Sequence, residues 1–323
     1  MATPTPKTSP LLPFSRDAVE EELMKSTGNY TRERIRPKTL PTWLYHYTSM
    51  DGVEGVLKSN VIHASNIAFM NDESELEHGV WLVNQTLESF PISMAEPTSI
   101  PPSDLLAIES IRYVIRNAQT MLQAYVACFC RVDDLLSQWR AYGASDAAYS
   151  MRFSAARLNR QIQPWSLLAP VEYLGHNQVD RAHELIKTIR SALRQFDVQA
   201  KDITESNISF VASIVQFPFA IVVLLMKHPA FKEEKEWRLV YGPLFFDEKD
   251  RAKVLVKFRR GVAIPYVEIG SVGKDDQPRD IPVRGLRVGP HKDSAMAATG
   301  LEHLLTSLNR SDVSVASSTT PLR

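Results

Sequence analysis

The stretch Lys227–Tyr241, which reads KHPAFKEEKEWRLVY, organises the rest of the chain. A long uncharged segment ends at its first residue, and every side chain of Lys232–Glu236 is charged. The residues that follow alternate as a β-strand does and predict two faces, with Trp237, Leu239 and Tyr241 on one and Glu236, Arg238 and Val240 on the other. A carboxylate and a guanidinium thus share the face opposite an apolar stripe. That face either lines a polar cleft or is a solvated sheet face with an ordinary ion pair, and the second arrangement is the commoner one.

The composition is that of a globular protein with a sizeable core. The chain has 323 residues, of which 44% are hydrophobic and 23% are charged, and this length suits one or two domains. Lysine plus arginine and aspartate plus glutamate both number 37, so the chain has no global basic footprint for nucleic acid.

The two cysteines and the N-terminal sequence indicate the cellular compartment in which we expect the protein. Cys128 and Cys130 lie two apart in an apolar run, a spacing that suits neither a common disulfide nor a four-ligand zinc site. We therefore expect free thiols in a reducing compartment and a cytoplasmic location. Residues 1–17 are rich in proline and lack the apolar core of a secretory signal.

We expect three regions along the chain. Residues 1–40 are predicted to be a flexible arm with at most one weak helix, because they are rich in proline, serine and threonine. Residues 41–308 are predicted to form a single α+β domain, and residues 309–323 a disordered tail.

The expected elements of the domain follow no regular strand–helix alternation. Strands are predicted at 42–49, 61–64, 124–131, 148–153, 166–174, 236–242, 254–258, 262–269 and 283–288. Helices are predicted at 51–58, from about 72 to 89, at 104–123, from 154, at 177–197 and at 293–308. This order predicts a mixed, mainly antiparallel sheet core with flanking helices, and not a Rossmann sheet.

One segment is long and apolar enough to span a membrane. Ser206–Met226 is uncharged, but it contains Gln216 and Pro218. We expect a core helix kinked near the proline, and no membrane partner.

Several motifs together resemble one family. They are Leu44-Tyr45-His46-Tyr47-Thr48, Asn71-Asp72 with Glu75, Cys128-Phe129-Cys130, Trp139 with Tyr142, Lys227, Glu233–Arg238 and Val288-Gly289-Pro290. In this order and spacing they resemble domain-of-unknown-function family 2971, a mostly bacterial intracellular family, over about residues 42–305. The chain departs from the family pattern at Cys130, where the family usually has serine, and at Glu73, where it usually has proline.

Resemblance to this family implies no particular activity. A second, more distant resemblance does imply one. A Tyr-His-x-Thr strand, a central aromatic residue and a glutamate opening a late strand are similar to the His-Tyr-Glu pattern of ADP-ribosyltransferases, which implies an ADP-ribosyltransferase-like fold and NAD as co-substrate. By this resemblance His46 contacts a ribose, beside Tyr47, and Glu236 is the catalytic carboxylate, with Glu233 as the fallback. Such a carboxylate stabilises the oxocarbenium-like transition state of glycosidic cleavage.

The same resemblance assigns the remaining site residues. The aromatic residue that stacks on nicotinamide is Tyr142 or Tyr149, with Trp139 nearby, and Arg238 is a phosphate partner. Asn71 and Asp72 complete the substrate-binding set. Structural explanations exist for several of these residues, since a histidine in an aromatic strand is more often structural, and aromatics three apart on a helix more often pack together.

Two other classes of function stay open. The first is a non-catalytic binding module or defence-associated regulator. The second is a metal-dependent phosphoesterase in which Asp72, Glu75, Glu233 and Glu236 converge on a divalent cation. No pair of metal-ligating histidines supports the second, so we expect no metal. A small-molecule nucleotide is the expected partner, and the sequence names no acceptor macromolecule.

Overall fold

The computed structural model of the protein describes residues 11–69, 73–89, 100–142, 147–161, 166–242, 253–259, 261–270 and 280–321. Contacts divide the chain into two compact units, each drawn from segments far apart in the sequence. The helical unit draws on residues 1–35, 77–122 and 175–223, and the sheet unit on residues 36–76, 123–174 and 224–323. That residues 41–308 fold as one domain stays a prediction.

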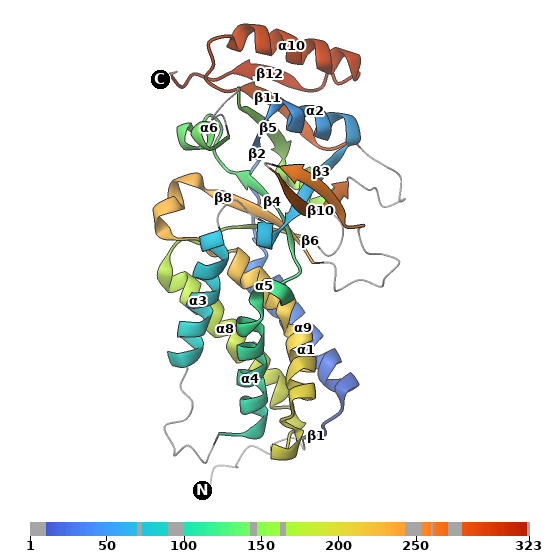
Figure 1. Ribbon diagram of the computed structural model, residues 1–323, viewed down its shortest axis with the longest axis vertical. Coiled ribbons are helices and arrows are strands. Elements are labelled where there is room, and N and C mark those ends of the chain that lie inside the picture. The colour runs from blue at the N-terminus through green and yellow to red at the C-terminus, as the bar shows by residue number, and fades with distance from the viewer. Residues whose placement is uncertain are drawn as a thin grey trace, which may run out of the picture. The chain divides into compact units, whose positions relative to one another are not determined.

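The helical unit consists mainly of helices that run alongside one another (Figure 1). They are α1 (Arg16–Tyr30), α3 (Glu73–Ser89), α4 (Pro102–Arg116), α5 (Ala118–Met121), α8 (Gly175–Leu193) and α9 (Glu205–Leu224). Two short strands, β1 (Leu12–Pro13) and β7 (Phe196–Asp197), pair in parallel. Helix α8 packs against α1 and α4, and Asp104 of α4 accepts a hydrogen bond from Arg194 just beyond α8, at 2.6 Å to Nε.

Helix α1 lies in the segment that the sequence assigns to a flexible arm. Ser15 caps it by accepting from the backbone N–H of Ala18. Its buried residues are Val19, Leu23, Thr27 and Tyr30. Their spacing of four, four and three residues places them on one helical face. This short apolar stripe, hidden in a polar composition, makes residues 16–30 part of the helical unit and not a flexible arm.

Helix α9 is the segment whose length and mean hydropathy, 2.0 over its best window, meet the criterion for a membrane span. Two-thirds of that window, 67%, is buried inside the protein. Pro218 lies within the helix, which runs from Glu205 to Leu224. Such burial is typical of a core helix, as the sequence predicts.

Ten strands of the described residues form one sheet in the sheet unit. They are β2 (Trp43–Thr48), β3 (Val61–Asn66), β4 (Tyr125–Cys130), β5 (Tyr149–Ser154), β6 (Ser166–Pro170), β8 (Glu236–Tyr241), β9 (Leu255–Arg259), β10 (Val262–Gly270), β11 (Val283–Val288) and β12 (Ser314–Ser317). Their order is β12-β11-β5-β2-β4-β3-β10-β9, with β8 pairing to β4 and β6 to β8. Every pair is antiparallel except β11 with β12, so the predicted mainly antiparallel sheet is confirmed.

Short helices flank this sheet. They are α2 (Met50–Ser59), α6 (Leu136–Tyr142), α7 (Ala155–Gln161) and α10 (Ser294–Ser307), with a 3₁₀ helix at Pro229–Glu234. Ser49 caps α2 by accepting from the Gly52 N–H, and Asn60 ends it in the left-handed conformation. These boundaries agree with the start and stop signals in the sequence.

The sheet is split at β4. Strand β8 pairs along the whole of β4, from Tyr125 to Cys130, and so occupies one of its edges. The other edge is shared, because β3 pairs with it at Tyr125 and Val126 and β2 pairs with it at Cys130. Strands β2 and β3 therefore pair with opposite ends of the same edge of β4.

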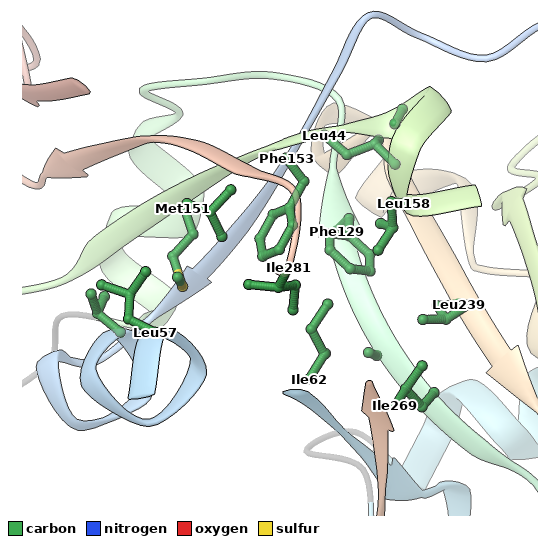
Figure 2. Packing of buried hydrophobic residues seen from close by; sticks show 14 of the residues in the cluster. Leu44, Leu57, Ile62, Phe129, Met151, Phe153, Leu158, Leu239, Ile269 and Ile281 are labelled. Atoms are coloured by element: carbon green, nitrogen blue, oxygen red, sulfur yellow. The ribbon is translucent and has the colours of Figure 1, made fainter. Parts of the chain in front are cut away.

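One hydrophobic core joins the two halves of the split sheet. Figure 2 shows Leu44 of β2 and Phe153 of β5 facing the same space as Ile62 of β3 and Ile269 of β10, with Phe129 of β4 between them. Leu44 and Phe153 are fully buried. Because both halves bury the same core, the split cannot open without exposing these side chains.

The C-terminal residues, predicted to be a disordered tail, contain β12. This strand pairs with β11 in parallel register, from Gly285 with Ser314 to Val288 with Ser317. The polar composition of the segment concealed this pairing, because an edge strand needs backbone hydrogen bonds more than apolar side chains.

Candidate functional site

Glu236 and Arg238 form a buried ion pair at the start of β8. Glu236 accepts from Arg238 Nε at 2.8 Å and from Nη2 at 3.0 Å, and it also accepts from Lys227 Nζ at 3.1 Å. The exposed fractions of Glu236, Arg238 and Lys227 are 7%, 1% and 6%. The predicted ion pair is present, but its face is neither solvated nor an open polar cleft.

The charges of this network fix the ionisation of Glu236. Burial alone would raise the pKa of Glu236, but the Arg238 guanidinium and the Lys227 ammonium outweigh burial and lower the pKa to about 2. Glu234 also belongs to this network, because it accepts from Lys227 Nζ at 2.6 Å. Two carboxylates thus face two cations, which is how buried charges are tolerated.

Glu233, the fallback for the catalytic carboxylate, lies outside this network. It is exposed on the 3₁₀ helix, and it accepts from Ser137 Oγ at 3.1 Å. Lys235, between this helix and β8, adopts a left-handed conformation with φ of 43°. The sequence analysis did not single out Glu234, because nothing in a run of charged residues tells which carboxylate turns inward.

His46 lies where β2 separates from β4. Its Nδ1 is 2.8 Å from the carbonyl oxygen of Cys128, which lies between the β3 and β2 pairings of β4. Because a carbonyl oxygen only accepts, Nδ1 must carry the proton, and the neutral ring keeps its lone pair on Nε2. Burial lowers the pKa of His46, and the nearby Lys257 cation lowers it further.

The strand register sets His46 and Glu236 on opposite faces of the sheet. Cys130 pairs with Glu236 of β8 and with Tyr45 of β2, so these three residues share a face. His46 follows Tyr45 and therefore points to the other face, where its ring centroid lies 5.7 Å from that of Phe129. The structure does not bring together the histidine and the glutamate that the transferase pattern pairs.

The aromatic residues of the predicted site pack with one another. The rings of Tyr47 and Trp139 pack edge to face, with their centroids 4.7 Å apart. The ring centroid of Tyr142 lies 6.5 Å from that of Tyr47. The hydroxyl of Tyr47 donates to the Val132 carbonyl, at 3.1 Å. These three aromatics belong to a small cluster on the Tyr45 face, whereas Tyr149 is buried in the main core.

Other predicted ligands give no site among the described residues. Asn71 and Asp72 lie outside the described residues, as does the side chain of Glu75. In the described part of the chain, no group of three or more histidine, cysteine, aspartate or glutamate residues could hold a metal ion. Glu233 and Glu236 also do not converge there.

Asp134 is a residue that the sequence analysis missed. Its carboxylate accepts from the indole Nε1 of Trp139 at 2.8 Å and from the backbone N–H of Thr319 at 2.8 Å. The hydroxyls of Ser318 and Thr320 donate to it as well. Burial would raise the pKa of Asp134, but these hydrogen bonds outweigh it and lower the pKa to about 2.

The comparisons with known proteins identify one family. The model of the protein of unknown function DUF2971 matches residues 138–239. No curated protein and no solved structure matches the chain. The matched segment contains Trp139, Tyr142, Tyr149, Lys227 and the Glu236–Arg238 pair, and it excludes His46. Over residues 138–239 the chain is therefore similar to the protein family of unknown function DUF2971, which is the family that its sequence motifs resemble.

Proposed function

We propose that the protein binds a ribose-bearing nucleotide such as NAD through His46, as a binding module and not as a transferase that uses Glu236. The observation that carries the proposal is the hydrogen bond between His46 Nδ1 and the Cys128 carbonyl, at 2.8 Å. It orients the ring and leaves Nε2 as an acceptor with no hydrogen-bond partner among the described residues. A ribose hydroxyl is a donor that fits this nitrogen.

Burial and charge favour a neutral ring at physiological pH. The pKa of His46 is lowered by burial and by the Lys257 cation, so Nε2 stays unprotonated near pH 7. The same cation offers electrostatic attraction to the phosphates of a nucleotide. An acceptor nitrogen and a positive charge therefore lie near each other.

The position of Glu236 argues against NAD cleavage by this residue. A carboxylate that stabilises an oxocarbenium-like ribose must lie beside the anomeric carbon. Glu236 points to the face opposite His46 and is occupied by Arg238 and Lys227. A ligand held by His46 would not reach it.

The test is isothermal titration calorimetry, in which NAD or ADP-ribose is titrated into the wild-type protein. His46→Asn is the informative variant, because the asparagine amide can still donate to the Cys128 carbonyl while Nε2 is lost. We expect it to weaken binding about tenfold, the roughly 1.4 kcal/mol of one hydrogen bond. His303→Asn, at an exposed position of α10, is the matched control and should bind as wild type does.

Three results would contradict the proposal. If wild type binds neither compound, or if His46→Asn binds as tightly as wild type, His46 is not a ribose contact. If wild type cleaves NAD and Glu236→Gln abolishes cleavage without loss of thermal stability, the protein is an ADP-ribosyltransferase-like enzyme after all, and the binding-module assignment is wrong.

A further inference from the structure

Strand β9 forms an open edge of the sheet. Within the described residues it is the last strand of the order and pairs only with β10, from Arg259 opposite Val262 to Leu255 opposite Tyr266. Its other edge therefore presents backbone N–H and C=O groups that pair with no strand in the described part of the chain. Such an edge can accept another extended chain.

One face of this edge is apolar and exposed. Val254, Val256 and Phe258 alternate along the strand and are 49%, 54% and 82% exposed. Val256 pairs with Pro265 of β10, whose face continues into the buried Val267. The exposed row is thus an uncovered extension of the core face, and a row of this kind marks an interaction surface.

The sequence of β9 and of the residues next to it is basic. The segment from Lys253 to Arg260 contains two lysines and two arginines and no acidic residue. Lys257 lies between Val256 and Phe258 in the strand, so it points to the other face, where its Nζ is 5.2 Å from the Tyr266 ring centroid. Charged residues on edge strands discourage aggregation, but that role does not account for the exposed apolar row.

We propose that β9 binds an extended segment of a partner protein in which apolar and acidic residues alternate. Added to the open edge, such a strand would place its apolar side chains beside Val256 and Phe258 and its carboxylates beside Lys257. The backbone hydrogen bonds would supply affinity, and the alternation of side chains would supply specificity.

The charges disfavour a second copy of this chain as the occupant. Pairing β9 with β9 of another copy would set two basic strands side by side, and like charges across a strand pair are destabilising. An acidic strand converts the same contacts into attraction. The proposal uses neither His46 nor Glu236, and Lys257 is the residue that it shares with the proposed function.

The test is fluorescence anisotropy with labelled synthetic peptides matched in length to β9. One peptide alternates valine with glutamate, and the other alternates valine with lysine. We expect only the glutamate peptide to bind, and its affinity to fall as salt rises from about 50 to about 300 mM. Phe258→Ser should weaken binding at least about tenfold, because this side chain is the largest in the exposed row. Met296→Ser, which removes another exposed apolar side chain at 71% exposure on α10, should bind as wild type does.

Hydrogen exchange identifies the place of binding. The glutamate peptide should slow exchange of backbone amides in residues 254–258 and leave those of β2 unchanged. Equal binding of both peptides, no binding of either, or unchanged exchange in residues 254–258 would overturn the proposal. Self-association of wild type that Phe258→Ser abolishes would also overturn it, because the occupant would then be a second copy.

Discussion

Glu236 binds Arg238 through both carboxylate oxygens, at 2.8 Å to Nε and 3.0 Å to Nη2, two residues apart on one strand. Arg238 in turn donates through Nη1 to the Leu224 carbonyl, at 2.7 Å. The pair therefore connects the first residue of β8 to Leu224, another residue of the sheet unit. Because both side chains are buried, removing either charge breaks a buried ion pair from one side.

This relationship gives the first prediction. Glu236→Gln should destabilise the sheet unit by about 3–5 kcal/mol, the usual cost of breaking a buried ion pair from one side. Urea unfolding measures the change. Glu233→Gln is the matched control, and it should change stability by less than about 0.5 kcal/mol because that residue is exposed. Equal stability of the two variants would contradict a structural role for Glu236.

The same carboxylate predicts a pH dependence. The pKa of Glu236 is lowered from 4.5 to about 2 in the folded protein, so the unfolded state binds a proton more readily. Its contribution to stability is complete above about pH 4.5 and is lost as pH falls toward 2. Thermal melts between pH 6 and 2 should therefore show a smaller decline in melting temperature for Glu236→Gln than for wild type. Parallel declines would refute this expectation.

His46 predicts a second pH effect. Its pKa is lowered below 6.5, so protonation favours the unfolded state, and stability from this group declines as pH falls below 6.5. Nuclear magnetic resonance of the imidazole carbons measures this pKa directly. We expect a value below 6.5 in wild type, and a higher value when Lys257→Met removes the nearby cation. A pKa at or above 6.5 in wild type would contradict the lowering of the His46 pKa by burial and by Lys257.

Asp134 predicts how the C-terminal strand is held. Asp134→Gly keeps the left-handed backbone, with φ of 55°, and removes the acceptor of Ser318, Thr319 and Thr320. Hydrogen exchange in β12 should become faster in this variant, and truncation after Ser317 should have a similar effect. Unchanged exchange in both proteins would show that the pairing with β11 alone holds the strand.

At position 289 the structure leaves no room for a side chain larger than that of glycine. A Cβ at this position would lie 2.8 Å from Trp139 Cε3 and 2.9 Å from the Ala148 carbonyl oxygen. Gly289→Ala should therefore cost about 1–3 kcal/mol through overpacking. Gly300→Ala, within α10 and with nothing near its Cβ, should instead stabilise the protein by about 0.5–1 kcal/mol. Chemical denaturation of both variants measures their free energies of unfolding. Equal changes in the two variants would disprove the steric argument.

The sequence by itself determined most elements and the sheet type. The alternation at Glu236–Tyr241 predicted β8 and its apolar face, and Trp237, Leu239 and Tyr241 lie in the main core. The helix predicted at 51–58 lies within α2, and the apolar run at 124–131 predicted β4. These signals are local, because periodicity and capping depend on residues only a few positions apart.

Only the tertiary structure decided which residues meet. Local alternation fixes which residues of one strand share a face, but the pairing of Tyr45 with Cys130, and of Cys130 with Glu236, places His46 and Glu236 on opposite faces. A register shift of one residue would reverse that result. The burial of Glu236, the inward turn of Glu234 and the binding of the C-terminal strand at Asp134 likewise depend on contacts between distant segments. Such contacts leave no periodic trace in a sequence, because their geometry is set by how strands pair and cores pack.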